Sequence, residues 1–198
     1  MTGNSIFRTI YLVGFVSMFV MRLSYRLRGR DTRAAVTRAG SLEMFLLALA
    51  FVGMAATPLV YVSSDVLDFA DYQLPVWTGW VGTLVFLAAI GLLWRSHRDL
   101  GRNWSQTLEL REGHELVTKG VYRRIRHPMY AAFWLWGLAQ PLLLHNWLAA
   151  FSHLASFAAL YFLRVGREER LMLDHFGARY EAYMSRTGRV LPRWARLS

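Results

Sequence analysis

The stretch HPMYAAFWLWGLAQPLLLHNWLAAFSHLASFAALYFL, residues 127–163, contains no Asp, Glu, Lys or Arg. It is too long for one bilayer crossing, which takes about 20 residues of helix. The polar pair His145-Asn146 lies near its middle and separates two apolar segments, residues 129–144 and 147–163. The stretch therefore predicts two membrane-spanning helices joined by a turn at this pair.

Three further apolar segments precede this stretch, at residues 6–21, 41–62 and 76–94. The first carries Arg8 near its end, from where a long side chain can reach the headgroup region. Arginines follow this segment and no small-residue cleavage site is evident, so a removed signal peptide is not expected. The sequence predicts an all-α, polytopic integral membrane protein with about five transmembrane helices.

The composition agrees with a membrane protein, because 55% of the 198 residues are hydrophobic and the net charge is +10. The chain contains no cysteine, which excludes disulfides, thiolate metal sites and a cysteine nucleophile. No internal repeat or flexible linker interrupts it. We expect one membrane domain over residues 1–198, with three spans in residues 1–94 and the candidate chemistry in residues 95–198.

The basic residues are confined to alternate connections between the apolar segments. All of the 23 Lys and Arg except Arg8 lie between the first two segments, in the linker of residues 95–126, or beyond residue 163. By the positive-inside rule, this pattern predicts an outside N-terminus and a cytoplasmic C-terminus. It also indicates attraction to anionic lipid. A nucleic-acid role is disfavoured, since the arginines are dispersed over three connections without a recognisable binding module.

The pair His127-Pro128 stands where the basic linker ends and the apolar tract begins. Proline is favoured in the first turn of a helix, so we expect the fourth span to begin at Pro128. His127 then lies beside exposed backbone N–H groups and the positive end of the helix dipole, a place that suits an anionic ligand group. The same place predicts that His127 protonates less readily. The alternative is an interfacial histidine that only caps the helix.

A second candidate cluster follows the fifth span, where Glu168 and Glu169 stand among several arginines. The apolar spacing beyond residue 163 predicts an amphipathic helix on the cytoplasmic surface. Arg164 and Glu168 are four residues apart and share a face of that helix. Adjacent carboxylates point in different directions, so we expect at most one of them to face a site. The alternative is a solvated helix surface with weak local ion pairs.

The linker of residues 95–126 is polar. Within it, TLEL and ELVT flank the turn-like REGH, which predicts either a small hairpin or an ordered loop. No histidine spacing in the chain matches a metal site, so we expect no metal ligands.

Four pieces of sequence stand in a fixed order around the apolar tract: LGRNWS (100–105), ELVTKGVYRRIRHPMY (115–130), EERLMLDHFGARYEAY (168–183) and VLP (190–192). Together they resemble the isoprenylcysteine carboxyl methyltransferase family, within the wider group of membrane methyltransferases that includes phospholipid N-methyltransferases. The resemblance covers about residues 99–194, whereas the first three spans match only in being apolar. A glycine is frequent two places after the motif tyrosine, and Ala132 stands there in this chain.

The resemblance implies an enzyme that uses S-adenosylmethionine. It places this cofactor in a cytoplasm-facing pocket formed by the linker, the Arg-His-Pro-x-Tyr segment and the C-terminal helix, while a lipophilic acceptor enters from the bilayer. Catalytic contacts are assigned by motif to Arg126, His127 and Glu168. Cofactor contacts are assigned in the same way to Leu116, Val117, Gly120, Tyr122, His127, Pro128, Tyr130, Glu168 and Glu169.

We expect His127 and the adjacent helix end to contact polar or anionic parts of the cofactor, and one of the two glutamates to accept its hydrogen bonds or to fix Arg126. Tyr122, Tyr130 and Trp104 are expected to wall the pocket, with cation–π contact to the sulfonium.

The acceptor determines whether a general base is needed. A carboxylate can attack directly, whereas an ammonium group must first lose a proton, for which His127 or a glutamate could serve. The segment LVTKGVYRRIRHPMY (116–130) looks most similar to the carboxyl O-methyltransferases, which favours O-methylation of an isoprenylcysteine-like carboxylate. The alternatives are phospholipid N-methylation, thiol S-methylation, a reductase related to membrane sterol reductases, and a non-catalytic subunit that binds lipid or a partner.

Overall fold

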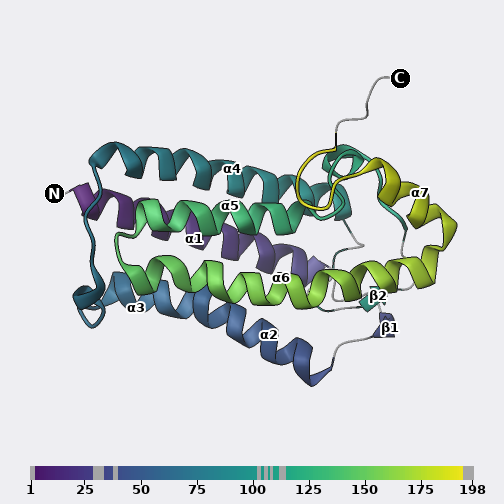
Figure 1. Cartoon of the computed structure of the whole chain (residues 1–198), viewed down its shortest axis with the longest axis horizontal. Coiled ribbons are helices and arrows are strands. Elements are labelled where there is room, and N and C mark those ends of the chain that lie inside the picture. Colours follow the sequence, from purple (N-terminus) through teal and green to yellow (C-terminus); the bar gives the residue numbers. More distant parts are fainter. Residues whose placement is uncertain are drawn as a thin grey trace.

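The computed structural model describes residues 3–28, 34–37, 40–101, 104, 107, 109–111 and 115–193. Figure 1 shows long helices running side by side, with the start of α1 at one end of the bundle and α7 at the other. The helical elements are α1 (Gly3–Arg28), α2 (Ser41–Phe51), η1 (Val52–Ala56), α3 (Thr57–Ser63), η2 (Asp68–Ala70), α4 (Val76–Leu100), η4 (Gly120–Arg123), α5 (Pro128–Leu143), α6 (Trp147–Phe176) and α7 (Ala178–Arg186).

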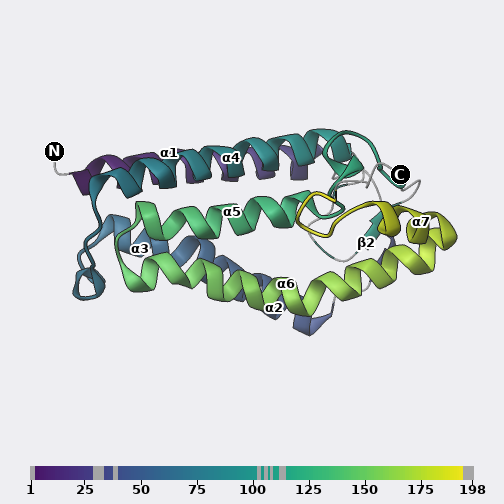
Figure 2. The ribbon, with the colours of Figure 1, turned by 45° about the horizontal axis from the view of Figure 1, so that its top comes forward.

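The predicted polytopic helical fold is confirmed. In the described part of the chain, four helical segments are long and apolar enough to cross a bilayer. The predicted fourth span is α5, whose 16 residues extend about 24 Å at 1.5 Å each. This helix is shorter than the ~30 Å hydrocarbon core, but it lies inside the bundle between α4 and α6 (Figure 2). The four longer segments are Ser5–Leu27, Ser41–Ser63, Val76–Leu100 and Trp147–Phe176.

The second pass is an unbroken run of α2, the π-helical turn η1 and α3. It packs closely on α6 at Gly53, where a Cβ atom would lie 2.1 Å from Ser156 Oγ and 2.3 Å from the Ser152 carbonyl oxygen. The Ser152 hydroxyl donates a hydrogen bond to the Gly53 carbonyl at 2.9 Å. Glycine is therefore needed here because the two helices approach backbone to backbone.

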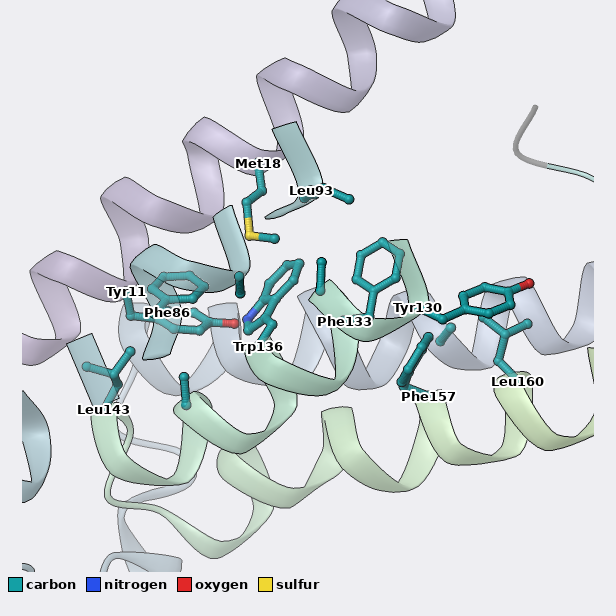
Figure 3. Close-up of a cluster of buried hydrophobic side chains, with 14 of the residues drawn as sticks. Tyr11, Met18, Phe86, Leu93, Tyr130, Phe133, Trp136, Leu143, Phe157 and Leu160 are labelled. Carbon is teal, nitrogen blue, oxygen red and sulfur yellow. The ribbon is translucent and has the colours of Figure 1, made fainter. Parts of the chain in front are cut away.

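The packed interior is aromatic and joins the layers of the bundle (Figure 3). Tyr11 of α1 stacks on Phe86 of α4 with ring centroids 5.7 Å apart, and Phe86 contacts Trp136 of α5 at 5.9 Å. Further along α5, Phe133 contacts Phe157 of α6 at 5.4 Å. Burial of such large rings supplies much of the stabilisation between α1, α4, α5 and α6.

The two helix boundaries predicted in the apolar tract are confirmed, since α5 begins at Pro128 and the chain turns at His145-Asn146. Asn146 is fully buried and is the N-cap of α6, where its side chain accepts a hydrogen bond from the Ala149 N–H at 3.0 Å. Its amide also donates to the Leu67 carbonyl at 2.6 Å and to Asp71 at 2.8 Å. One side chain thus caps a helix and fixes the connection between α3 and α4.

The predicted surface helix beyond residue 163 is the continuation of α6. This helix has 30 residues, or about 45 Å, and so extends beyond the thickness of a hydrocarbon core. Gly177, with φ of 51°, ends α6 and allows the turn into α7.

The prediction of a hairpin within the linker, one of two possibilities considered, is wrong. The strand β2 (Glu109–Arg111) pairs antiparallel with β1 (Ala34–Thr37) from the first connection, while residues 115–118 form no strand. The predicted turn was residues 111–114; Arg111 is the last residue of β2, and residues 112–114 lie outside the described residues. The pairing partner is distant in sequence, so the local pattern gave no sign of it.

The contacts of Asn146 predict a loss of stability in Asn146→Ala. Removal of an N-cap costs about 1 kcal/mol, and loss of the hydrogen bonds to Leu67 and Asp71 adds about 0.5–1.5 kcal/mol each. We expect a lower melting temperature for the purified protein in detergent. Asn146→Asp serves as the comparison, since it keeps the cap acceptor but cannot donate to Leu67 or Asp71. Unchanged melting of Asn146→Ala would contradict this account of the turn.

Candidate functional site

The segment before α5 is held by the chain that follows α7. The backbone N–H groups of Arg126 and His127 donate to the carbonyls of Gly188 and Arg189, each at 2.9 Å, and the Gly188 N–H donates to the Arg124 carbonyl at 3.0 Å. The motif residues Arg126 and His127 are therefore fixed by residues more than sixty positions later in the chain.

Glu169 of α6 is the centre of this arrangement and is almost fully buried, with 4% exposed. Its carboxylate accepts hydrogen bonds from Arg126 Nε at 2.6 Å and from both Nε and Nη2 of Arg189. His127 Nε2 lies 3.2 Å from the same carboxylate. Charge-assisted hydrogen bonds of this kind are the strong ones, so Glu169 ties α6 to the two segments that flank it.

Glu168, the next residue, points into the cavity described below. Its carboxylate accepts a hydrogen bond from the Tyr130 hydroxyl at 2.5 Å and lies 3.6 Å from His127 Nδ1. The Tyr130 ring stacks on the His127 ring, with centroids 5.4 Å apart and planes inclined by 16°. Because its side chain stays 32% exposed, Glu168 retains acceptor capacity toward a ligand.

The expectation that His127 protonates less readily is wrong. Burial lowers the pKa of His127, but hydrogen bonds and attraction from Glu168 and Glu169 outweigh it and leave that pKa raised. The two ring nitrogens face two different carboxylates. His127 is the residue before the helix, yet its side chain makes no cap hydrogen bond. The nearby carboxylates therefore decide its charge, and the helix dipole does not.

Arg164 extends the polar cluster to the second pass. It lies 3.1 Å from Glu43 and 3.8 Å from Glu168. Glu43 is fully buried near the start of α2. A carboxylate buried at a membrane-spanning helix needs a cationic partner, so this ion pair holds α2 against α6.

A cavity of about 470 Å³ opens beside this cluster. At one end it is lined by Arg126, His127, Glu168 and two tyrosines of α7, Tyr180 and Tyr183. Its other end is apolar and is lined by side chains from α1, α2, η1, α5 and α6. These include Phe15, Met18, Leu47, Ala50, Met54, Trp136 and Leu160. The cavity therefore joins a polar, charged end to a hydrocarbon-like interior.

Most of the residues proposed from sequence line this cavity. They are Leu116, Val117, Tyr122, Arg126, His127, Pro128, Tyr130 and Glu168, together with Trp104.

The other two proposed residues act beside the cavity. Glu169 is bound to Arg126 and Arg189, as described above. Gly120 has φ of 61°, and a Cβ atom there would lie 2.0 Å from Asp99 Oδ2. The Asp99 carboxylate accepts from the Val121 N–H at 2.8 Å, so Gly120 shapes the turn that places Tyr122.

Tyr122 is positioned by neighbours from both ends of the chain's second half. The Tyr183 hydroxyl donates to its carbonyl at 2.7 Å, and its own hydroxyl donates to the Ser96 carbonyl at 3.4 Å. Burial raises the pKa of Tyr122 well above its ordinary value, so its hydroxyl stays protonated.

The sequence did not indicate the wall supplied by α1, α2 and η1, because those segments had been assigned only as apolar spans. It also gave no role to Tyr180 and Tyr183 beyond apolar positions of a helix. One signal was available in Glu43, since an acidic residue in a membrane-spanning segment is expensive and marks a specific partner.

Residues 80–174 match the model of the isoprenylcysteine carboxyl methyltransferase family. Among the relatives, protein-S-isoprenylcysteine O-methyltransferase B of Arabidopsis thaliana is 31% identical over 94 residues, which cover 46% of this chain and 48% of that protein. The protein-S-isoprenylcysteine O-methyltransferase of Xenopus laevis is 26% identical over 159 residues, 78% of this chain and 55% of that protein. The predicted resemblance to this family is confirmed.

The same likeness extends to three dimensions. A solved structure of the eukaryotic intramembrane Ras methyltransferase, an isoprenylcysteine carboxyl methyltransferase, superposes with a TM-score of 0.53 at 23% identity, over 80% of this chain and 54% of that one. This agreement shows a shared fold. The chain spans about half the length of the methyltransferases that it matches.

The raised pKa of His127 predicts a pH-dependent contribution to stability. The contribution is present in full below the ordinary histidine pKa of about 6.5 and is lost as the pH rises through the raised value in the folded protein. We expect the melting-temperature difference between the wild type and His127→Gln to shrink as the pH is raised from 6 to 9. His175→Gln, at an exposed position of α6, is the control. A difference that is constant or grows with pH would contradict the assignment.

Proposed function

We propose that this protein is a membrane methyltransferase that transfers the methyl group of S-adenosylmethionine to the carboxylate of a lipophilic, isoprenylcysteine-like acceptor. The observation that carries the proposal is the single cavity that joins the His127–Glu168 cluster to the apolar wall of α1, α2 and η1. Such a cavity offers a polar place to a water-soluble donor and an apolar place to a lipid. The names of the family and of the matched relatives support the same reaction.

The residues at the polar end fit the proposed cofactor. A volume of about 470 Å³ lies within the range of small-molecule sites. Glu168 keeps exposed acceptor atoms for hydroxyl or amino groups, and its negative charge favours a nearby sulfonium. Tyr122 and Tyr130 line the cavity with aromatic rings, and the faces of such rings attract a cation. Trp104 lines the cavity too, but the guanidinium of Arg22 lies over its ring at 5.5 Å.

The chemistry asks little of the protein beyond orientation and the exclusion of water. When bound, S-adenosylmethionine would supply an activated methyl group, and a carboxylate acceptor could take it without any proton transfer. His127 is flanked by two carboxylates that favour its protonated form, which makes it a poorer general base. This state favours a carboxylate acceptor over an ammonium group, which would have to be deprotonated first.

The proposed acceptor is a lipidated molecule that enters the cavity from the bilayer. The apolar lining residues of α1 and α2 include the strongly exposed Phe19 and Phe51, at 56% and 62%. In a membrane these side chains would face lipid, so the apolar end of the cavity would lie next to the bilayer in which a lipophilic acceptor dissolves. The proposed partners are therefore a lipophilic acceptor and membrane lipid, with no nucleic acid and no metal.

A donor-binding and acceptor-panel assay tests the function. We expect the purified protein to bind S-adenosylhomocysteine and to transfer labelled methyl groups to N-acetyl-S-farnesylcysteine, but not to phosphatidylethanolamine or a small thiol. Glu168→Gln should weaken S-adenosylhomocysteine binding about tenfold, because it removes one charge-assisted hydrogen bond. Glu181→Gln, at an exposed position of α7, is the matched control. No binding to the wild type would exclude a methyltransferase, and transfer only to the amine or thiol would exclude the proposed acceptor.

The proposed topology places the N-terminus outside and the C-terminus in the cytoplasm, on the basis of the basic residues. The absence of cysteine allows single-cysteine labelling without a background. In intact cells, a membrane-impermeant maleimide should label Val66→Cys, whose position is 69% exposed. Ser185→Cys, at an exposed position of α7, should react only after permeabilisation. The reverse labelling pattern would overturn the orientation.

A further inference from the structure

Arg22 is a cationic residue of the cavity wall that neither the sequence motifs nor the family match includes, since the match begins at residue 80. It lies on α1, within the first membrane-spanning segment, and is partly buried. Its guanidinium carbon lies 5.5 Å from the ring centroid of Trp104 and 5.1 Å from that of Phe133. Two aromatic faces thus hold the guanidinium beside the cavity.

No carboxylate of the described residues lies within ion-pair distance of Arg22. The acidic groups of the polar cluster are engaged elsewhere: Glu169 with Arg126 and Arg189, Glu43 with Arg164, and Glu168 with Tyr130 and His127. A guanidinium removed from water is costly without an anionic partner, and cation–π contacts repay only about 0.5–2 kcal/mol. The cavity beside Arg22 is therefore a favourable place for an anion brought by a ligand.

The position of Arg22 between the polar and apolar ends of the cavity indicates which kind of ligand would bring the anion. Phe133 follows Tyr130 by three residues, about one helical turn, on α5, so the Phe133 ring that Arg22 contacts belongs to a turn farther from His127 than the turn of Tyr130. Beyond it lie the apolar side chains of Met18, Ala50 and Trp136. Arg22 is thus at the junction of the polar and apolar ends, where the head group of a lipid-soluble molecule would meet the donor.

We propose that Arg22 binds the carboxylate of the lipophilic acceptor and determines the preference for a carboxylate. This inference rests on the proposed function. A guanidinium can bind both carboxylate oxygens with fixed geometry, which holds the reacting group at one depth while the hydrocarbon chain occupies the apolar end. Arg22 is then a residue for acceptor specificity, separate from the residues that hold the donor.

The test compares acceptor and donor affinity in Arg22 variants of the full-length protein. Arg22→Gln should raise the KM for N-acetyl-S-farnesylcysteine at least tenfold, because a charge-assisted pair is lost. Its affinity for S-adenosylhomocysteine, measured by calorimetry, should stay within about twofold of the wild type. The wild type should bind the acceptor more tightly than its carboxamide analogue, used as a competitive inhibitor, and Arg22→Gln should lose this preference. The KM and the carboxylate preference of Arg22→Lys should lie between those of the wild type and Arg22→Gln, because lysine keeps the charge but lacks the planar guanidinium.

Arg98→Gln is the matched control. Arg98 is exposed near the end of α4, its guanidinium stacks over Trp94 at 5.4 Å, and it does not line the cavity. We expect this variant to keep the wild-type KM and carboxylate preference.

Three outcomes overturn the inference. Arg22→Gln with unchanged KM and carboxylate preference shows that another group binds the acceptor. Weaker S-adenosylhomocysteine binding by both Arg22 variants assigns the residue to the donor. A wild type that binds S-adenosylhomocysteine but does not methylate the carboxylate refutes the proposed acceptor, and with it this role of Arg22. If Arg22→Gln does not fold, Arg22→Lys carries the same comparison.

Discussion

The buried carboxylate of Glu169 is the interaction on which the arrangement of the site depends. It binds two arginines, one from the segment before α5 and one from the segment after α7, and it also faces His127. A carboxylate removed from water is stable only when such partners are present, so these three parts of the chain are fixed together. The direction of Glu168 follows from this, since adjacent residues of a helix point to different sides. Glu168 therefore faces the cavity, where it accepts a hydrogen bond from Tyr130 and lies close to His127.

The cavity is assembled from two parts of the chain that differ in character. Residues 115–183 supply most of the polar end, and all but the last nine of them fall within residues 80–174, which match the family model, while α1, α2 and η1 supply the apolar wall. The pair formed by Glu43 and Arg164 joins these parts across α2 and α6. In the proposed reaction, the matched region builds most of the donor side, and much of the acceptor side lies outside it.

The motif residues could be identified from sequence because they stand in short, ordered pieces whose spacing is characteristic. Nine of the cavity residues were found in this way, including Trp104, Tyr122 and Tyr130. Arg22 could not be found, since an arginine at the end of an apolar segment has an ordinary explanation in membrane topology. Met18 could not be found either, since it is one of many apolar residues of a span. The charge of His127 was also missed, because the local helix end favours the neutral ring, whereas two carboxylates some forty residues later favour the charged one.

The sequence by itself determined the helical passes, the start of α5 at Pro128 and the turn at Asn146. These features follow from segment length, proline geometry and helix capping, which act over a few neighbouring residues. Only the tertiary structure decided which glutamate faces the cavity, how Arg126 and His127 are held, and which helices complete the wall. Those outcomes depend on contacts between distant segments, and buried charges select such contacts only once the helices have packed.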